Sequence, residues 1–250
     1  MIVQLSPRRT LPSRFWERHF RQSLDHPPVI PWERAGEISA VEREQLRSSI
    51  QEFQLGEQAE GRHLKDAAHT YAAESGDWVY LAALKLFIRE EQGHAALLGR
   101  FMDGVGIERV RHKWVDSVFR KLRRQAGLEL SICVLLAAEV IAQVYYDALF
   151  AATKSATLRA ICRRILNDEE QHVQFQSERL AILRRRRSRL LVDAAILLQR
   201  LLFAGTCVVV WRGHRLVFRA AGMTFRDFWV ACHGQMAAAF TLMNPRSYEW

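Results

Sequence analysis

The distribution of proline is the feature that most constrains what this chain can fold into. The chain has six prolines, of which the last two along the sequence are Pro31 and Pro245. A proline inside a helix removes a backbone hydrogen bond and costs roughly 3 kcal/mol. The long stretch between Pro31 and Pro245 contains none, which predicts a nearly all-helical (all-α) body after an irregular N-terminal arm.

Capping and turn residues divide the proline-free body into helices. Ser39 and Glu42 have the spacing of a capping box, which begins a first helix that ends at the turn 75–77. Further helices are expected at 78–102, 128–153, 157–187 and 225–243, with an amphipathic crossover at 114–126 and an apolar helix near 190–211. We therefore predict an arm at 1–38, a four-helix bundle at 39–187 and C-terminal helices packed on it at 188–250.

Two Glu-x-x-His motifs lie inside the expected helices. Glu91 precedes His94 in the first, and Glu169 precedes His172 in the second. Residues three apart on a helix share one face, so each carboxylate lies beside its imidazole. A single motif of this kind is common in a helical protein, but a repeated one suggests a shared site.

A lone glutamate lies well upstream of each motif, Glu60 before the first and Glu139 before the second, and an internal repeat at an offset of 79 aligns them. At ~1.5 Å of rise per residue, Glu60 lies roughly 22 Å before the intervening turn and Glu91 roughly 20 Å after it. The carboxylates therefore reach one level, and two such hairpins make a four-helix bundle. Glu57 shares the face but lies nearly a turn too low, so Glu60 is preferred; Glu57 and His63 stay open as ligands.

Four glutamates and two histidines inside an apolar bundle would be costly without cations, because buried carboxylates repel one another and lose their hydration. Two divalent metals would neutralise the four negative charges. Oxygen-rich ligation with one imidazole per metal favours iron, or manganese in one or both positions, over a structural zinc. Glu90 and Asp168 each precede a motif glutamate, where they could accept a hydrogen bond from the second ring nitrogen of a ligand histidine.

This pattern resembles the ligand set of the ferritin-like di-iron carboxylate superfamily over roughly residues 40 to 187. The matching residues are Glu60, Glu91, His94, Glu139, Glu169 and His172. The resemblance implies a ferritin-like bundle whose di-iron centre activates dioxygen to oxidise a small or lipid-like organic substrate, as in bacterial multicomponent monooxygenases and acyl desaturases. It also implies a separate electron donor, such as a ferredoxin or a reductase. The alternative is a ferroxidase or iron-handling protein, or a manganese peroxide scavenger.

Composition narrows the expected partners and compartment. The four cysteines are widely spaced without a Cys-x-x-Cys, which favours a reduced, cytoplasmic protein over a disulfide framework. The N-terminal part of the chain holds no apolar run typical of a signal peptide. The net charge of +9 favours an acidic partner or surface, while no nucleic acid is expected. The arginines within 184–189 either dock such a partner or form a solvated helix end.

Residues 190–211 form the most apolar long run and raise the question of a membrane span. Asp193, Gln199 and Arg200 lie inside the run, and a charge near the centre of a bilayer costs at least ~2.5 kcal/mol. We therefore expect a helix packed on the bundle rather than a span, with interfacial membrane contact and a homodimer left open. Together with the helix at 225–243, it is expected to cover one end of the bundle and to shape an apolar substrate pocket.

Overall fold

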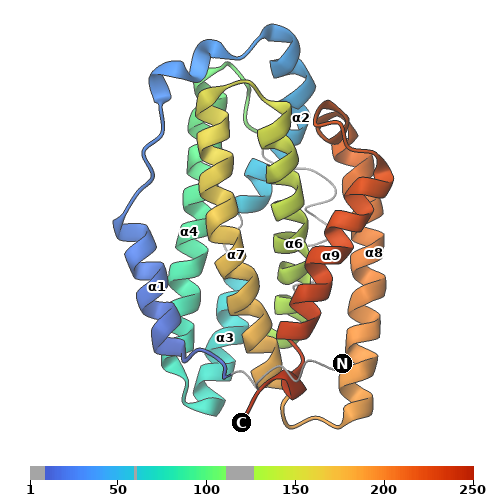
Figure 1. The fold of residues 1–250 in the computed structure, drawn as a ribbon. Coiled ribbons are helices and arrows are strands. Elements are labelled where there is room, and N and C mark those ends of the chain that lie inside the picture. The colour runs from blue at the N-terminus through green and yellow to red at the C-terminus, as the bar shows by residue number, and fades with distance from the viewer. Residues whose placement is uncertain (1–8, 59–60, 111–126) are drawn as a thin grey trace.

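The computed structural model describes residues 9–58, 61–110 and 127–250, and its regular elements there are helices (Figure 1). The expected crossover at 114–126 lies outside the described residues. The long helices are α2 (Ala40–Glu57), α3 (Arg62–Ser75), α4 (Trp78–Gly104), α6 (Leu128–Ala152), α7 (Ala156–Arg184), α8 (Arg189–Ala220) and α9 (Phe225–Leu242). The all-helical class predicted from the proline distribution is confirmed.

The central bundle consists of α4, α6 and α7 together with the pair α2 and α3. Helix α6 packs along α7, and α4 contacts α2, α3 and α7. The facing side chains are almost wholly apolar and include Leu84, Leu136 and Ile165, which are fully buried. This apolar interior surrounds the few buried carboxylates and imidazoles described below.

The first expected helix, 39–75, is in fact interrupted. Helix α2 begins with Ser39 accepting a hydrogen bond from the backbone N–H of Glu42, ends at Glu57, and gives way to α3 at Arg62. Gly61, which precedes α3, has a φ of 58°, and a Cβ there would lie 2.7 Å from Cδ1 of Ile88. The left-handed backbone and the close approach both favour glycine at this position. A lone glycine in a helix-favouring stretch gave no clear sign of this break.

The N-terminal arm is helical rather than irregular, which corrects the prediction for 1–38 within its described part. Helix α1 (Ser13–Asp25) buries Trp16 and Phe20 and packs along α4, and a short 3-10 helix, η1 (Trp32–Glu37), follows. Pro12 sits directly before α1, a position where its missing N–H costs nothing. The prolines therefore bound this helix instead of preventing it.

The C-terminal helices lie alongside the bundle and do not cover its end as expected (Figure 1). Helix α8 packs on α6 and α2, and α9 packs on α6, α7 and α8. Two helices in the described part of the chain are long and apolar enough to cross a membrane, α6 and α8. In their most apolar stretches 67% of α6 is buried but only 17% of α8, so α6 is a core helix and α8 is not.

Candidate metal centre

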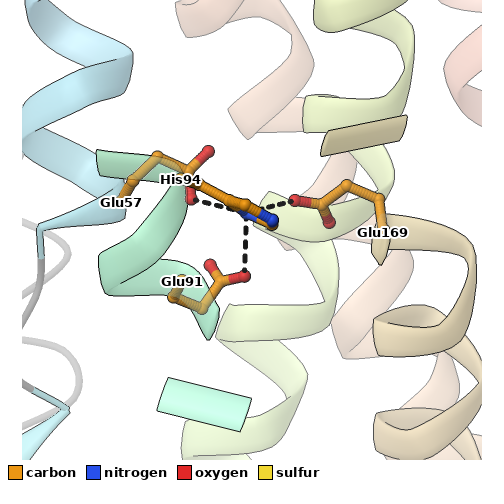
Figure 2. Close-up of side chains that lie close together, drawn as sticks. All are labelled: Glu57, Glu91, His94 and Glu169. Atoms are coloured by element: carbon orange, nitrogen blue, oxygen red, sulfur yellow. Dashed lines mark ion pairs between the residues drawn. The ribbon is translucent and has the colours of Figure 1, made fainter. Parts of the chain in front are cut away.

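Two overlapping groups of carboxylates and imidazoles meet inside the bundle. In each group, one potential ligand atom per residue lies within 4.8 Å of all the others. The first group is Glu57, Glu91, His94 and Glu169 (Figure 2), and the second is Glu91, Glu139, Glu169 and His172. Glu91 and Glu169 belong to both groups, so their carboxylates stand between two neighbouring positions for a cation.

Each of the long bundle helices α2, α4, α6 and α7 contributes to this cluster. Glu57 is the last residue of α2, α4 and α7 each supply one Glu-x-x-His motif, and α6 supplies Glu139 from its middle. Glu169 and His172 are fully buried, and Glu91 is the most accessible member with a side chain 14% exposed. The cluster therefore lies within the protein rather than on a solvated helix surface.

Each histidine is held by a carboxylate from the opposite motif. Nε2 of His94 lies 2.9 Å from Oδ2 of Asp168, and Nε2 of His172 lies 2.8 Å from Oε2 of Glu90. An imidazole that donates from Nε2 keeps its lone pair on Nδ1. Both Nδ1 atoms face the cluster, so both rings present a metal-binding nitrogen to it.

A further layer of contacts fixes these supporting carboxylates. Arg164 places its Nε 2.5 Å from Asp168 and its guanidinium 3.5 Å from Glu90. Ser23 of α1 donates a hydrogen bond to Glu90 and accepts one from Arg164. Sequence reasoning missed Ser23 and Arg164; the i,i+4 spacing of Arg164 and Asp168 was the only available signal.

The atoms that point into the cluster have no hydrogen-bond partner among the described residues. They are Oε1 of Glu91, Nδ1 of His94, Oε1 of Glu139, both carboxylate oxygens of Glu169 and Nδ1 of His172. The closest approach of a histidine to a glutamate among them is 3.0 Å, from Nδ1 of His172 to Oε1 of Glu91. Leaving one buried polar group unpaired costs about 1–3 kcal/mol. Because several unpaired ligand atoms point to the same place, binding of divalent cations explains them better than a cluster without metal does.

The electrostatics of the metal-free cluster lead to the same interpretation. Burial and repulsion by the Glu91 carboxylate raise the pKa of Glu57 well above its ordinary value. Burial and repulsion by the Glu139 carboxylate do the same for the pKa of Glu169. Burial opposes the charge on His172, but the surrounding glutamates outweigh it and raise the pKa of His172 well above 6.5. Burial alone would raise the pKa of Glu91, but the charge of His172 lowers it. Without metal, protons therefore reside on Glu57, Glu169 and His172, and a cation would displace them.

The structure brings together Glu91, His94, Glu139, Glu169 and His172 as the sequence suggested, whereas Glu60 lies outside the described residues. Glu57 occupies the first group, and its Oε1 accepts a 2.5 Å hydrogen bond from Tyr146. The rise argument against Glu57 assumed one continuous helix through residue 75. Because α2 ends at Glu57, that argument does not apply. His63, also left open as a ligand, is exposed and belongs to neither group.

Aromatic rings close one side of the centre. The ring centres of Phe87 and His172 lie 4.7 Å apart in an edge-to-face arrangement, and the ring centre of Phe20 of α1 lies 6.0 Å from that of the same histidine. Phe175 packs against both phenylalanines. This apolar wall keeps water from His172 and strengthens electrostatic interactions inside the site.

The arginine cluster at 184–189 divides into buried and exposed members. Arg184 is buried and donates to Glu129, while Arg187 also pairs with Glu129 and Arg189 with Asp193. Arg184 lines a surface groove of about 830 Å³ between α3, α6, α7 and α8, and no residue of either metal group lines that groove. Of the C-terminal helices, α8 thus lines a groove at the side of the bundle.

No protein-family model, curated protein or solved structure matches this chain. The candidate centre is therefore interpreted from its own geometry and chemistry.

Proposed function

We propose that the chain is a ferritin-like di-iron carboxylate oxidoreductase that activates dioxygen and oxidises an apolar organic substrate. The observation that carries the proposal is the pair of ligand groups that share Glu91 and Glu169 within a helical core. A cluster built for one structural ion needs no such sharing. A glutamate from each of two helices and a Glu-x-x-His motif from each of the other two is the arrangement found in di-iron and di-manganese carboxylate proteins, and iron in both positions would supply two-electron chemistry.

The donor set favours iron or manganese. Each group offers three carboxylates and one imidazole and no thiolate, and all four cysteines are buried without belonging to either group. Such oxygen-rich ligation is unlike that of structural zinc, which prefers thiolates and closed tetrahedra. Two divalent ions would bring four positive charges to a cluster that contains four glutamates.

The chain's own residues would bind and orient the metals while protecting the reaction. Two bound irons would supply the electrons that reduce dioxygen. Glu91 and Glu169 would help to hold both metals, and the hydrogen bonds from the histidines to Glu90 and Asp168 would fix both imidazoles. Burial and the nearby Glu57 raise the pKa of Tyr146 well above its ordinary value, so its phenol keeps the proton that it donates to Glu57.

The electron donor would be a separate ferredoxin or reductase. All four cysteines of the chain are free and buried, so they do not form an exposed redox pair. The exposed arginines Arg185 and Arg186 and the net charge of +9 would favour an acidic donor.

The proposal is tested by loading the metal-free protein anaerobically with two equivalents of Fe(II) and then measuring dioxygen uptake. We expect rapid uptake in proportion to the loaded chain, and loss of uptake in Glu91→Ala and Glu169→Ala. Glu74→Ala, which changes an exposed glutamate, is the matched control and should behave as the wild type. Uptake that is unchanged in the two cluster variants would refute the proposal.

The same preparation separates an oxygenase from an iron-handling protein. Storage would require a large assembly that loads far more than two irons per chain. A peroxide scavenger would consume hydrogen peroxide with manganese bound and take up no dioxygen with iron bound. We expect neither behaviour.

A further inference from the structure

Helix α8 carries an apolar face that no other part of the described chain covers. Leu190 is 81% exposed and Leu201 65% exposed, and the same face continues along the helix. Its exposed large apolar residues are Leu190, Leu191, Leu197, Leu198, Leu201, Leu202, Val209 and Leu216. They recur at helical spacing, so they form one continuous stripe of a kind that monomeric soluble proteins rarely expose.

The stripe is a second apolar face and does not result from poor packing of the helix. The opposite face of α8 is buried on the bundle through Val192, Phe203, Cys207 and Val217. Helix α8 therefore already has the apolar contacts that hold it in the fold. The exposed leucines add nothing to that packing, and their presence calls for a separate explanation.

The polar residues of the apolar run lie off this stripe. Gln199 is buried and accepts hydrogen bonds from Cys133 and Arg184. Asp193 pairs with Arg189 and Arg246, and the guanidinium of Arg200 lies 4.8 Å from the ring centre of Phe240 on α9. These contacts with the rest of the fold also oppose a membrane span, which would pull α8 away from α6 and α2. If α8 instead lies flat on a membrane surface, it can keep its contacts with α6 and α2.

Arginines flank the main part of the stripe, from Leu190 to Val209, at both ends. Arg215 lies about five full helical turns after Leu197, and Arg219 lies the same distance after Leu201. Both arginines are therefore on the same face of the helix as these leucines. Arg186 precedes the other end and, like Arg215 and Arg219, is exposed and has no ion pair among the described residues. The apolar stretch between the two ends, from Leu190 to Val209, is roughly 29 Å long.

This charge pattern disfavours a second copy of the chain as the occupant. Two copies pairing their stripes in antiparallel would place Arg215 near Arg186, and parallel pairing would place each arginine beside its counterpart. Like charges at close range oppose both arrangements. An anionic lipid surface instead offers acyl chains to the leucines and phosphates to the arginines, whose long side chains can reach headgroups while their stems stay apolar.

We propose that α8 lies in the plane of an anionic lipid bilayer, with its leucine stripe in the acyl region and its terminal arginines on headgroup phosphates. The inference stands apart from the metal chemistry, because no residue of the stripe belongs to either metal group. Leu198 and Leu202 of the stripe also line the groove beside Arg184. That groove would thus open at the membrane side of the molecule.

The test is co-sedimentation of the full chain with vesicles of equal parts phosphatidylcholine and phosphatidylglycerol, and with phosphatidylcholine alone. We expect binding to the anionic vesicles that weakens with added salt, and much weaker binding to the neutral ones. The double variant Leu197→Gln and Leu201→Gln should bind at least about tenfold more weakly. Arg215→Gln with Arg219→Gln should lose most of the preference for anionic lipid.

The control is Val41→Gln, which changes an exposed apolar residue on α2, 69% exposed, and should bind as the wild type. All these positions are exposed, so circular dichroism should show native helicity in every variant. Absence of vesicle binding by the wild type, or equal binding by the leucine variant, would overturn the proposal. So would a dimer in sedimentation velocity that only the leucine variant dissociates, because the stripe would then be a contact between two copies.

Discussion

The two halves of the candidate metal centre are built on different kinds of helix. The second half, with Glu139 and His172, comes from α6 and α7, which run without interruption through the site. The first half depends on Glu57, the last residue of α2, where the helix breaks. Counting residues along a helix therefore locates a ligand reliably only when the helix continues between the turn and the site.

The halves also differ in how they are enclosed. His172 is fully buried against Phe87, and its partner Glu90 is 3% exposed. His94 is bound to Asp168, whose side chain is 11% exposed and whose other partner is Arg164. The second half is therefore the more deeply buried of the two. Perturbations there should have the larger consequences for metal binding.

The largest expected effect distinguishes the shared carboxylates from the unshared ones. Glu91→Ala and Glu169→Ala should each remove both metals, because both groups contain these residues. Glu139→Ala should remove the metal of the second half and leave the first. Metal content per chain after gel filtration measures this difference. Equal losses in Glu91→Ala and Glu139→Ala would show that the carboxylates are not shared.

The next effect identifies the glutamate of the first half. Glu57→Ala should lose the metal of that half, because the Glu57 carboxylate lies in the first group and its Oε2 lies 3.9 Å from Nδ1 of His94. Glu60, the ligand that the repeat predicts, lies outside the described residues, and Glu60→Ala is the comparison variant. Titration of the two variants with Mn(II), followed by electron paramagnetic resonance, compares them directly. The opposite result would restore the ligand that the repeat predicts.

A smaller effect compares the carboxylates that hold the histidines. Loss of such a partner typically weakens metal binding by about 10- to 100-fold. Glu90→Gln should lie near the upper end of this range, because Glu90 is buried and strongly stabilised as a carboxylate by His172. Burial alone would raise the pKa of Glu90, but the hydrogen bonds and charge of His172 outweigh it and lower the pKa to about 2. Asp168→Asn should lie near the lower end. Isothermal titration with Mn(II) gives both affinities, and a reversed order would contradict the proposed difference in enclosure.

The smallest expected effect is a pH dependence of stability in the metal-free protein. The folded pKa values of Glu57 and Glu169 are raised above 4.5, and that of His172 above 6.5. Such groups contribute stability below their unfolded pKa, and this contribution is lost as the pH rises through the raised folded values. The melting temperature in chelator should therefore fall as the pH rises above 6.5, while Mn(II) should remove most of this slope. A melting temperature in chelator that rises over the same interval would be inconsistent with a proton-filled cluster.

Much of the site could be predicted because periodicity and spacing survive in continuous helices. Glu139 was found from an offset along the chain, and it reaches the cluster because α6 is unbroken. Nothing in the sequence favoured Glu57, since the end of α2 at this residue and the left-handed backbone of Gly61 beside Ile88 are seen only in the folded structure. The cross-pairing of Glu90 with His172 is a similar case, because it depends on how α4 and α7 face each other.

The N-terminal and C-terminal regions were predicted less well for a different reason. Prolines were taken as a sign of irregular chain, but Pro12 and the prolines at 27–28 lie outside α1 and leave room for a helix that buries Trp16 and Phe20. For α8, composition alone indicated an apolar helix. It could not show which side chains face the bundle, because both faces of α8 are apolar over most of its length.

The most direct test of the central claim is a crystal structure of the Mn(II)-loaded protein with anomalous diffraction from the metal. We predict two ions roughly 3.5–4 Å apart, both bound by Glu91 and Glu169, with His94 on one and His172 on the other. A single ion, or two ions that do not share these glutamates, would contradict the account.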